Sequence, residues 1–368
     1  MGYHGYIVVL GFITAFVVVL LTTPSLIKVA RMKHLVDEPG DARKLHSRSV
    51  PTIGGIIIFA GIIFSYTLWF PVGEPIAGLS GFEDLYLSMG KAYKEFKYLI
   101  AAMVLLFFIG VKDDIIGFSP VKKLIGHFIV GYILVMMADI RITSLYGLFG
   151  VEILEYHVSV GFSLFVYIVL VNAINLIDGV DGLAAGIGFI SAVAFGTWFY
   201  LAGNVPDTLL SAVLAGALLA FLVFNFSPAR VFMGDSGSLI IGAIITVLAM
   251  KMIEGDPSSL PIQIKGLPKP IFAMAIIAYP LIDTFRIFIY RMSKGTSPFA
   301  ADRNHIHHRL MRLGAGHRAT VFILYFYTVV MIGVSFLVRD LNITYGLLIT
   351  GSVGFILLFI PFLIKPKS

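Results

Sequence analysis

Cysteine is absent from this 368-residue chain, which excludes disulfides, thiolate nucleophiles and thiolate metal sites. Charged residues are scarce, at 13% of the chain, whereas hydrophobic residues make up 58%. The mean hydropathy is +0.94. Because a soluble domain exposes far more charge than this, the composition indicates an integral membrane protein.

Long apolar runs recur along the whole chain, and a helix of about 20 such residues can cross the hydrocarbon core of a bilayer. The runs lie near 5–23, 52–70, 98–111, 121–138, 158–171, 183–201, 208–226, 238–253, 271–290, 319–338 and 343–364. They predict an all-α polytopic membrane protein with about eleven transmembrane helices. No internal repeat interrupts the pattern, so we expect a single domain over residues 1–368.

The positive charge has a topological explanation. The net charge is +6, and most of the 27 Lys and Arg residues fall in loops that follow odd-numbered helices or in the C-terminal tail. Basic loops stay in the cytoplasm, which predicts an N-terminus outside and a cytoplasmic C-terminus. Nucleic-acid binding is therefore not needed to explain the charge. Alternating residues within 140–158 predict a small β-hairpin outside the bilayer.

Two amides and two carboxylates, Asn172, Asn175, Asp178 and Asp181, follow the fifth apolar run. The first three recur every third residue and so share one helical face. Polar groups at the mouth of a membrane helix are costly unless they bind something. Capping of two helices would need one polar group per helix end, not four. The cluster therefore suits a polyphosphate and its cation.

Three further polar motifs also follow odd-numbered helices. They are Lys112-Asp113-Asp114 after the third, Phe232-Met-Gly-Asp235-Ser-Gly-Ser238 after the seventh, and Asp302-Arg303-Asn304-His305-Ile-His307-His308-Arg309 after the ninth. Independent helix caps would scatter over both faces of the membrane. All four motifs lie on the predicted cytoplasmic side, where they can converge on one site.

The adjacent carboxylates of Asp113 and Asp114 repel each other. One can therefore have a raised pKa and act as a base, or both can be held by a lysine or a cation. Lys122 and Lys123 can supply that charge or grip a phosphate. The alternative is a charged interfacial loop that obeys the positive-inside rule.

Asp235 lies between glycines just before a helix. A carboxylate beside free backbone amides can hold a hard divalent cation whose other ligands are phosphate oxygens. Simple N-capping by Asp235 and Ser236 is the alternative. Phe232 can stack on a base, although a membrane-facing aromatic residue is equally ordinary.

The His/Arg loop is the most polar segment of the chain. Imidazole and guanidinium groups together favour phosphate recognition. His305, His307 and His308 could instead bind zinc, but the abundant arginine disfavours a dedicated cation cage. Another basic loop, Arg43-Lys44-Leu-His46-Ser-Arg48, can bind lipid headgroups or nucleotide phosphate. Asp283 and Arg286, three residues apart, are predicted to form a structural ion pair without a chemical role.

Together the four motifs resemble those that define the polyprenyl-phosphate N-acetylhexosamine-1-phosphate transferases, in order and over nearly the whole chain. Within that superfamily the His305-Ile-His307-His308-Arg309 loop is similar to the WecA/TagO branch, which uses UDP-N-acetylglucosamine. The MraY branch, which uses UDP-N-acetylmuramoyl-pentapeptide, carries three consecutive histidines there. Ile306 interrupts the run, which argues against MraY chemistry.

The resemblance implies roles for the matched residues. Asp235, with Asn175, would hold Mg²⁺, which Mn²⁺ can replace, against the UDP-sugar pyrophosphate. Asp178 and Phe232 would line the uridine pocket, and Lys123 would contact the carrier phosphate. The remaining substrate-binding candidates are Lys44, His46, Asn172, Asp181, Arg303 and Arg309, and the catalytic candidates are Asp113, as base, Asp114, Asp178, His305, His307 and His308.

The implied reaction transfers N-acetylglucosamine 1-phosphate from UDP-N-acetylglucosamine to undecaprenyl phosphate, releases UMP and starts a lipid-linked cell-envelope glycan such as a teichoic acid or an O-antigen. The enzyme would be a multi-pass protein of the cytoplasmic membrane whose site faces the cytoplasm; formation of a homodimer stays open. Direct displacement and an aspartyl-phosphate route are both compatible with the residues. A secondary transporter and a zinc-dependent membrane hydrolase are the rival functions, although the carboxylates gather at helix ends rather than mid-membrane.

Overall fold

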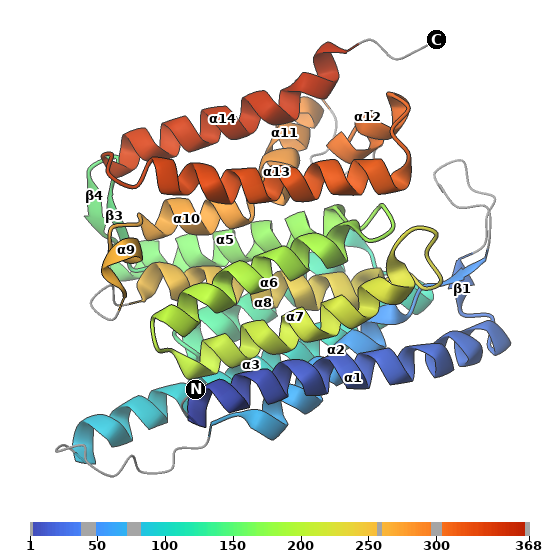
Figure 1. The fold of residues 1–368 in the computed structure, drawn as a ribbon, viewed down its shortest axis with the longest axis horizontal. Helices are drawn as coiled ribbons and strands as arrows, with labels where there is room; N and C mark the ends of the chain where they lie inside the picture. Colours follow the sequence, from blue (N-terminus) through green and yellow to red (C-terminus); the bar gives the residue numbers. More distant parts are fainter. Residues whose placement is uncertain (1–2, 38–48, 72–81, 256–259, 296–303, 365–368) are drawn as a thin grey trace.

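The structure, a computed structural model, consists mainly of helices that lie roughly parallel or antiparallel to one another (Figure 1). The structure describes residues 3–37, 49–71, 82–255, 260–295 and 304–364. The first helices are α1 (Tyr3–Met32), α2 (Gly54–Trp69), α3 (Phe82–Ile116), α4 (Pro120–Tyr132), continued by the π-helical turn η1 (Ile133–Met137), α5 (Tyr156–Leu176), α6 (Leu183–Leu201), α7 (Val205–Asn225) and α8 (Gly234–Glu254). They are followed by α9 (Ile262–Lys265), α10 (Lys269–Ile276), α11 (Ala278–Ser293), α12 (Ile306–Arg312), α13 (His317–Leu337) and α14 (Ile343–Leu363).

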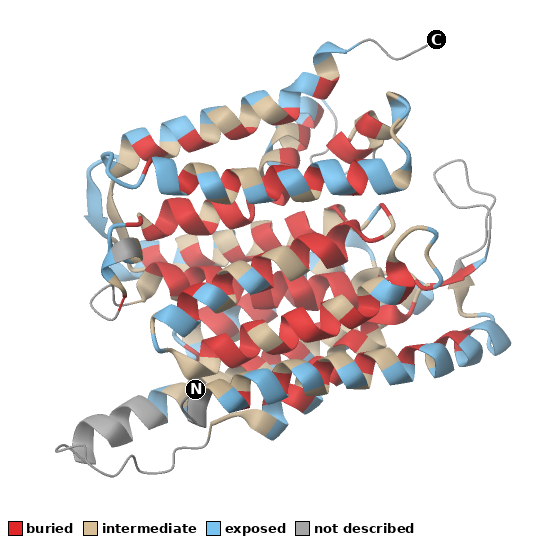
Figure 2. Cartoon of the chain, viewed as in Figure 1, coloured by how far each residue is buried: buried red, intermediate tan, exposed pale blue. Residues whose placement is uncertain are grey.

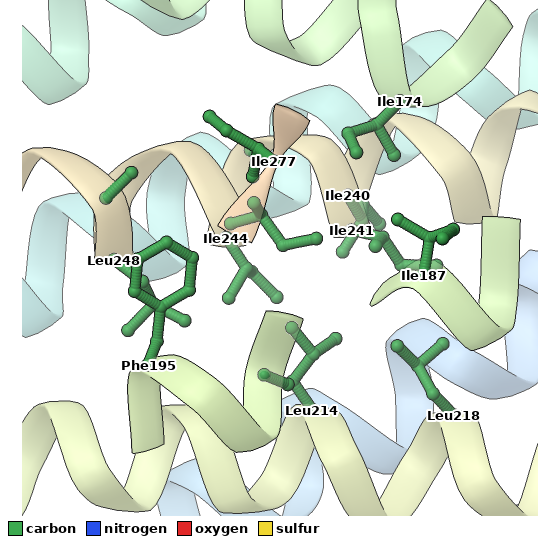
Figure 3. Packing of buried hydrophobic residues seen from close by; sticks show 14 of the residues in the cluster. Ile174, Ile187, Phe195, Leu214, Leu218, Ile240, Ile241, Ile244, Leu248 and Ile277 are labelled. Atoms are coloured by element: carbon green, nitrogen blue, oxygen red, sulfur yellow. The ribbon is translucent and has the colours of Figure 1, made fainter. Parts of the chain in front are cut away.

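Helix α8 forms the centre of the molecule. In its most apolar 18-residue window 94% of the residues are buried, and Figure 2 shows the buried residues concentrated around it. Its apolar side chains pack against α5, α6 and α7; Figure 3 labels Ile174, Ile187, Phe195, Leu214, Leu218, Ile240, Ile241, Ile244 and Leu248. A helix that is hydrophobic all round is stable only when every face is covered, as here.

Glycines bring two neighbours very close to the first turn of α8. A Cβ atom on Gly110 of α3 would lie 2.5 Å from the Cα of Ser236, and one on Gly55 of α2 would lie 2.1 Å from the Gly237 nitrogen. No side chain fits at either position. The end of α3 and the start of α2 therefore meet the residues around Asp235.

Two short antiparallel strand pairs lie outside the helices. Strand β1 (Val36–Asp37) pairs with β2 (Val50–Pro51), and β3 (Ser144–Leu148) pairs with β4 (Val151–Ile153). Gly147, near the end of β3, and Gly150, in the β3–β4 turn, both have positive φ, a conformation that glycine adopts without strain. This pair lies within residues 140–158, where the sequence predicts a hairpin.

The two ends of the assembly differ. Helix α12, strand β1 and the α5–α6 and α7–α8 loops gather at one end, whereas β3, β4 and α9 lie at the other (Figure 1). We call these the site end and the hairpin end. Helix α1 starts toward the hairpin end, and α14 finishes at the site end (Figure 1).

Eight helices in the described ranges are long and apolar enough to cross a membrane, or nine if α10 and α11 count as one broken span. The polytopic membrane character is therefore confirmed, whereas the predicted number of eleven spans is not. Two predicted spans do not meet this criterion of length and apolar composition. Helix α2 has only 16 residues, and α3 begins with a charged stretch. Both nevertheless pack on α8.

Helices α10 and α11 are bent by 78° where they meet at Ile277. Pro280 explains the break, because proline has no N–H to donate to the carbonyl four residues earlier and its ring collides with that carbonyl. The bend brings α11 against α5. It also positions the polar residues of α11 that contact the segment with His305, His307 and His308, which we call the His loop.

Candidate active site

Asp114, at the end of α3, caps the start of α8. Its Oδ1 accepts a hydrogen bond from the backbone N–H of Asp235 at 2.7 Å, and its Oδ2 accepts one from Ser236 at 3.0 Å. A carboxylate at a helix N-terminus satisfies free N–H groups and complements the helix dipole. Gly234, with φ +70°, passes so close that a Cβ there would lie 2.7 Å from the Asp114 carboxylate oxygens. Asp114 thus holds the turn that carries Asp235.

Lys123 of α4 connects Asp113 of α3 with Asp235 of α8. Its Nζ lies 3.0 Å from Asp113 Oδ2 and also forms an ion pair with Asp235 Oδ2. The three side chains are partly buried, with exposed fractions of 16% for Asp113, 18% for Lys123 and 27% for Asp235. One ammonium therefore compensates two carboxylates at the edge of the protein, where a ligand can reach them.

Asn175 of α5 completes this group, which we call the site cluster: Asp113, Lys123, Asn175 and Asp235. The Asn175 Nδ2 donates to Asp235 Oδ1 at 2.8 Å and to Ser238 Oγ at 2.8 Å. The amide is thereby oriented, and its oxygen has no hydrogen-bond partner among the described residues. It can serve as a ligand beside Asp235.

The loop after α5 lies against the site cluster. Burial raises the pKa of Asp178 well above its ordinary value, and the nearby charges of Asp235 and Asp114 raise it further. A neutral carboxyl group can donate a hydrogen bond as well as accept one. Asp181 instead accepts from the Ala229 N–H at 3.0 Å, so it ties this loop to the α7–α8 connection.

Phe232 is positioned through its backbone. Its N–H donates to the Pro51 carbonyl at 2.7 Å, and its own carbonyl accepts from Gly54 at 3.0 Å. The α7–α8 connection is therefore attached to the β2–α2 segment immediately before Asp235.

The histidines lie at the start of α12, opposite the α5–α6 loop. His305 Nδ1 lies 2.9 Å from Asp283 Oδ2, and His307 Nδ1 lies 3.1 Å from the Tyr279 hydroxyl; both partners belong to α11. The His307 Nε2 faces Gly179, where an added Cβ would be only 3.2 Å away. The His loop and the α5–α6 loop are therefore direct neighbours.

Several predicted residues have other contacts or fall outside the described part. The Arg309 guanidinium donates to the carbonyls of Pro361 and Ile364 at 3.0 and 2.6 Å, which joins α12 to the end of α14. Asn172 donates to the Ile168 carbonyl at 2.7 Å. Lys44, His46 and Arg303 lie outside the described residues. Their proposed roles in substrate binding stay predictions.

One residue of the site neighbourhood was missed from the sequence, and another, Asp283, was assigned only part of its role. His127 is buried, and its Nδ1 lies 3.3 Å from Asn172 Nδ2; the signal for it was its position one helical turn after Lys123. Asp283 does contact Arg286, at 3.0 Å, as predicted. It also holds His305, so the assignment of a purely structural ion pair was incomplete.

The donor set fits a hard divalent cation completed by substrate. Among the described residues, no group of three or more His, Asp or Glu side chains could hold a metal ion by itself. Asp235 and Asn175 offer one carboxylate and one amide oxygen next to each other. Mg²⁺ is commonly held by one or two carboxylates together with substrate phosphates and water, rather than by an all-protein cage.

Comparison with known proteins identifies the family of this chain. Residues 96–253, which include the site cluster, match Glycosyl transferase family 4. An undecaprenyl-phosphate alpha-N-acetylglucosaminyl 1-phosphate transferase of Salmonella typhi is 31% identical over 83% of this chain and 77% of its own length. The Escherichia coli K12 protein of the same name is 31% identical over 78% of this chain and 72% of its own length.

A third relative has a similar level of identity. A probable undecaprenyl-phosphate N-acetylglucosaminyl 1-phosphate transferase of Bacillus subtilis is 30% identical over 86% of this chain and 81% of its own length. The similarity thus extends well beyond residues 96–253 and over most of each relative. This chain belongs to the family of the undecaprenyl-phosphate N-acetylglucosaminyl 1-phosphate transferases, within Glycosyl transferase family 4.

Proposed function

We propose that this protein transfers N-acetylglucosamine 1-phosphate from UDP-N-acetylglucosamine to undecaprenyl phosphate and releases UMP. The observation that carries the proposal is the convergence of Asp113, Lys123, Asn175 and Asp235 from four helices on one point, next to the α5–α6 loop that His307 faces. The names of the relatives support the same donor and carrier. The product would start a lipid-linked cell-envelope glycan.

Donor binding uses the site cluster and the α5–α6 loop. Asp235 and Asn175 would hold Mg²⁺ against the donor pyrophosphate, and Mn²⁺ can take its place. That cation would supply positive charge for the leaving phosphate oxygens. A neutral Asp178 can exchange hydrogen bonds with the polar edge of the uracil, and Phe232 can stack on its face.

The carrier phosphate is the nucleophile. Its oxygen attacks the sugar-linked phosphorus, a new P–O bond forms, and the bond to UMP breaks. Lys123 can leave its carboxylate partners to contact the incoming phosphate. Asp113 would accept the proton of a monoprotonated carrier phosphate, although with a second pKa near ~6 this phosphate is mostly deprotonated at neutral pH.

We further propose that the site end faces the cytoplasm of a cell whose cytoplasmic membrane holds the protein. UDP-sugars are water-soluble cytoplasmic metabolites, and the basic loops follow the positive-inside rule. In this orientation α2 and α3 would also cross the bilayer, giving about eleven spans, and the β3–β4 hairpin would lie outside.

The direct test is UMP release by purified, detergent-solubilised protein with undecaprenyl phosphate, Mg²⁺ and one UDP-sugar at a time. UDP-N-acetylglucosamine, UDP-N-acetylgalactosamine and UDP-N-acetylmuramoyl-pentapeptide form the panel. We expect release only with UDP-N-acetylglucosamine, and only when lipid and metal are both present. Release with the pentapeptide donor would overturn the specificity. Release that needs zinc but no carrier would indicate a hydrolase instead.

A further inference from the structure

Two imidazoles of the His loop are held in the same way by one helix. Tyr279 and Asp283 are four residues apart on α11, so their side chains lie one above the other on one face. Tyr279 contacts His307 and Asp283 contacts His305, in both cases at Nδ1. The two rings are nearly parallel, with an interplanar angle of 6° and centroids 5.4 Å apart. Helix α11 thus orients both rings by the same nitrogen.

The Asp283 contact determines which nitrogen of His305 carries hydrogen. Asp283 Oδ1 accepts from the Ile306 N–H at 3.2 Å and from Arg286 at 3.0 Å. Beside a guanidinium the carboxyl group is an acceptor-only carboxylate. The short contact at Oδ2 therefore requires hydrogen on His305 Nδ1.

The Tyr279 contact works in the opposite sense. Tyr279 is fully buried, and in the described part of the chain its hydroxyl has one hydrogen-bonding neighbour, His307 Nδ1. A buried hydroxyl hydrogen without an acceptor is destabilising. The hydroxyl therefore donates to Nδ1, which must carry a lone pair.

His307 is then neutral with its hydrogen on Nε2. Burial lowers the pKa of His307 to about 3, and the neighbouring His308 and His305 lower it in the same direction. A neutral imidazole has one protonated nitrogen, and Nδ1 is the acceptor. The N–H therefore lies on Nε2, which faces Gly179 between Asp178 and Asp181.

We propose that Tyr279 is a positioning residue that keeps His307 in its Nε2–H tautomer, so that the neutral imidazole donates a hydrogen bond to a phosphate oxygen of the donor nucleotide. The phosphate in this statement rests on the proposed function, whereas the tautomer does not. A ring held in this way is neither a general base nor a zinc ligand through Nε2, because that nitrogen has no free lone pair.

The tautomer is measured by long-range ¹H–¹⁵N correlation spectra of detergent-solubilised protein labelled with [¹⁵N]histidine. His307→Gln identifies the His307 signals by their loss. We expect a protonated Nε2 and an unprotonated Nδ1 for His307, with Tyr279→Phe shifting the ring toward the other tautomer. A protonated Nδ1 in the unaltered protein, or an unchanged pattern in Tyr279→Phe, would overturn the proposal.

Tyr327→Phe is the matched control. Tyr327 is also buried in this bundle, and its hydroxyl donates to a backbone carbonyl, that of Gly354, at 3.2 Å. We expect this variant to leave the His307 signals unchanged. Tyr279→Phe should lower kcat about 10-fold, as expected for loss of one oriented hydrogen bond to a charged group, whereas Tyr327→Phe should not lower it.

Addition of UDP-N-acetylglucosamine to the labelled protein separates this proposal from the proposed function. A change of the His307 Nε2 signal upon binding is expected, even without the lipid carrier and hence without turnover. If the protein binds the nucleotide and His307 does not respond, the phosphate contact is refuted while the transferase activity stands. If the protein turns over no UDP-sugar but shows the expected tautomer, only the proposed function fails.

Discussion

The two ends of the molecule contain the same arrangement of charges. At the site end Lys123 bridges Asp113 and Asp235. At the hairpin end Lys251 bridges Glu95 and Asp207, with Nζ 2.7 Å from the Asp207 carboxylate. Helices α3 and α8 contribute to both, and the two lysines are equally exposed, at 18%. A lysine between two carboxylates therefore does not by itself identify an active site.

The surroundings of the two lysines differ. The hairpin-end cluster, Glu95, Asp207 and Lys251, borders a cavity of about 530 Å³ that is also lined by Lys91, Asp139, Arg141 and Glu254. Arg141 lies 2.7 Å from Asp139, and Glu254 accepts from the Thr143 hydroxyl at 2.6 Å. At the site end, the Asp114 carboxylate lies beside Asp235 as a third acidic group, in addition to Asp113. The site end is therefore distinguished by the additional Asp114 carboxylate and by the neighbouring α5–α6 loop, rather than by the ion pair itself.

The largest effect should follow from removing charge at the site end. Asp235→Asn should lower UMP release by about 1000-fold or more, because the carboxylate is needed for charge stabilisation of the phosphates. The variant should unfold at nearly the same temperature as the unaltered protein, since an amide can still accept from Asn175. Turnover close to that of the unaltered protein would show that Asp235 does not belong to the active site. The proposed difference in function between the two ends would then be wrong.

The corresponding change at the hairpin end should affect stability instead. Lys251→Met leaves Glu95 and the buried Asp207 without their cation, which should lower the unfolding free energy by about 3 kcal/mol. The folded fraction should keep its specific activity. The double variant Lys251→Met with Asp207→Asn is the control and should recover part of the stability. Loss of turnover in fully folded Lys251→Met would mean that the hairpin end takes part in catalysis.

A pair of glycine variants sharpens the comparison. Gly234 and Gly203 have nearly equal φ, +70° and +72°, but a Cβ meets the Asp114 carboxylate only at Gly234. Gly234→Ala should displace the first turn of α8 and lower kcat up to about 100-fold. Gly203→Ala has open space and should cost only the left-handed strain of about 1 kcal/mol, without change in activity. Equal activity of both variants would show that the Asp114 cap does not position Asp235.

The smallest expected effect is a loss of folding stability as the pH falls. Because the pKa of His307 falls from 6.5 to about 3 on folding, the unfolded chain binds a proton between these values that the folded protein does not. Stability from this group is present above pH 6.5 and is lost as the pH falls below it. Between pH 7.5 and 5.5 the unaltered protein should lose about 1 kcal/mol more than His307→Gln. Equal losses, measured by denaturant unfolding, would show that His307 is not buried neutral.

The apolar runs and the polar motifs could be predicted from neighbouring residues in the sequence. Each predicted span corresponds to a helix or helix pair, because apolar periodicity and length are properties of neighbouring residues. The structure also brings Asp113, Asn175 and Asp235 together and places His307 beside the loop that follows Asn175, while the roles of these residues stay predictions. The sequence did not predict contacts between distant segments, such as those of Tyr279 with His307 and of Asp283 with His305.

The sequence by itself determined the membrane character, the family and the set of residues near the site, because hydropathy and motif order are written along the chain. Only the tertiary structure decided what each side chain does. Asp114 reaches across 121 positions to cap Asp235, and Arg309 turns to α14 rather than to the site cluster. Hydrogen bonds depend on distances of a few tenths of an ångström between helices. Spacing along the chain contains no information about such distances until the helices have packed.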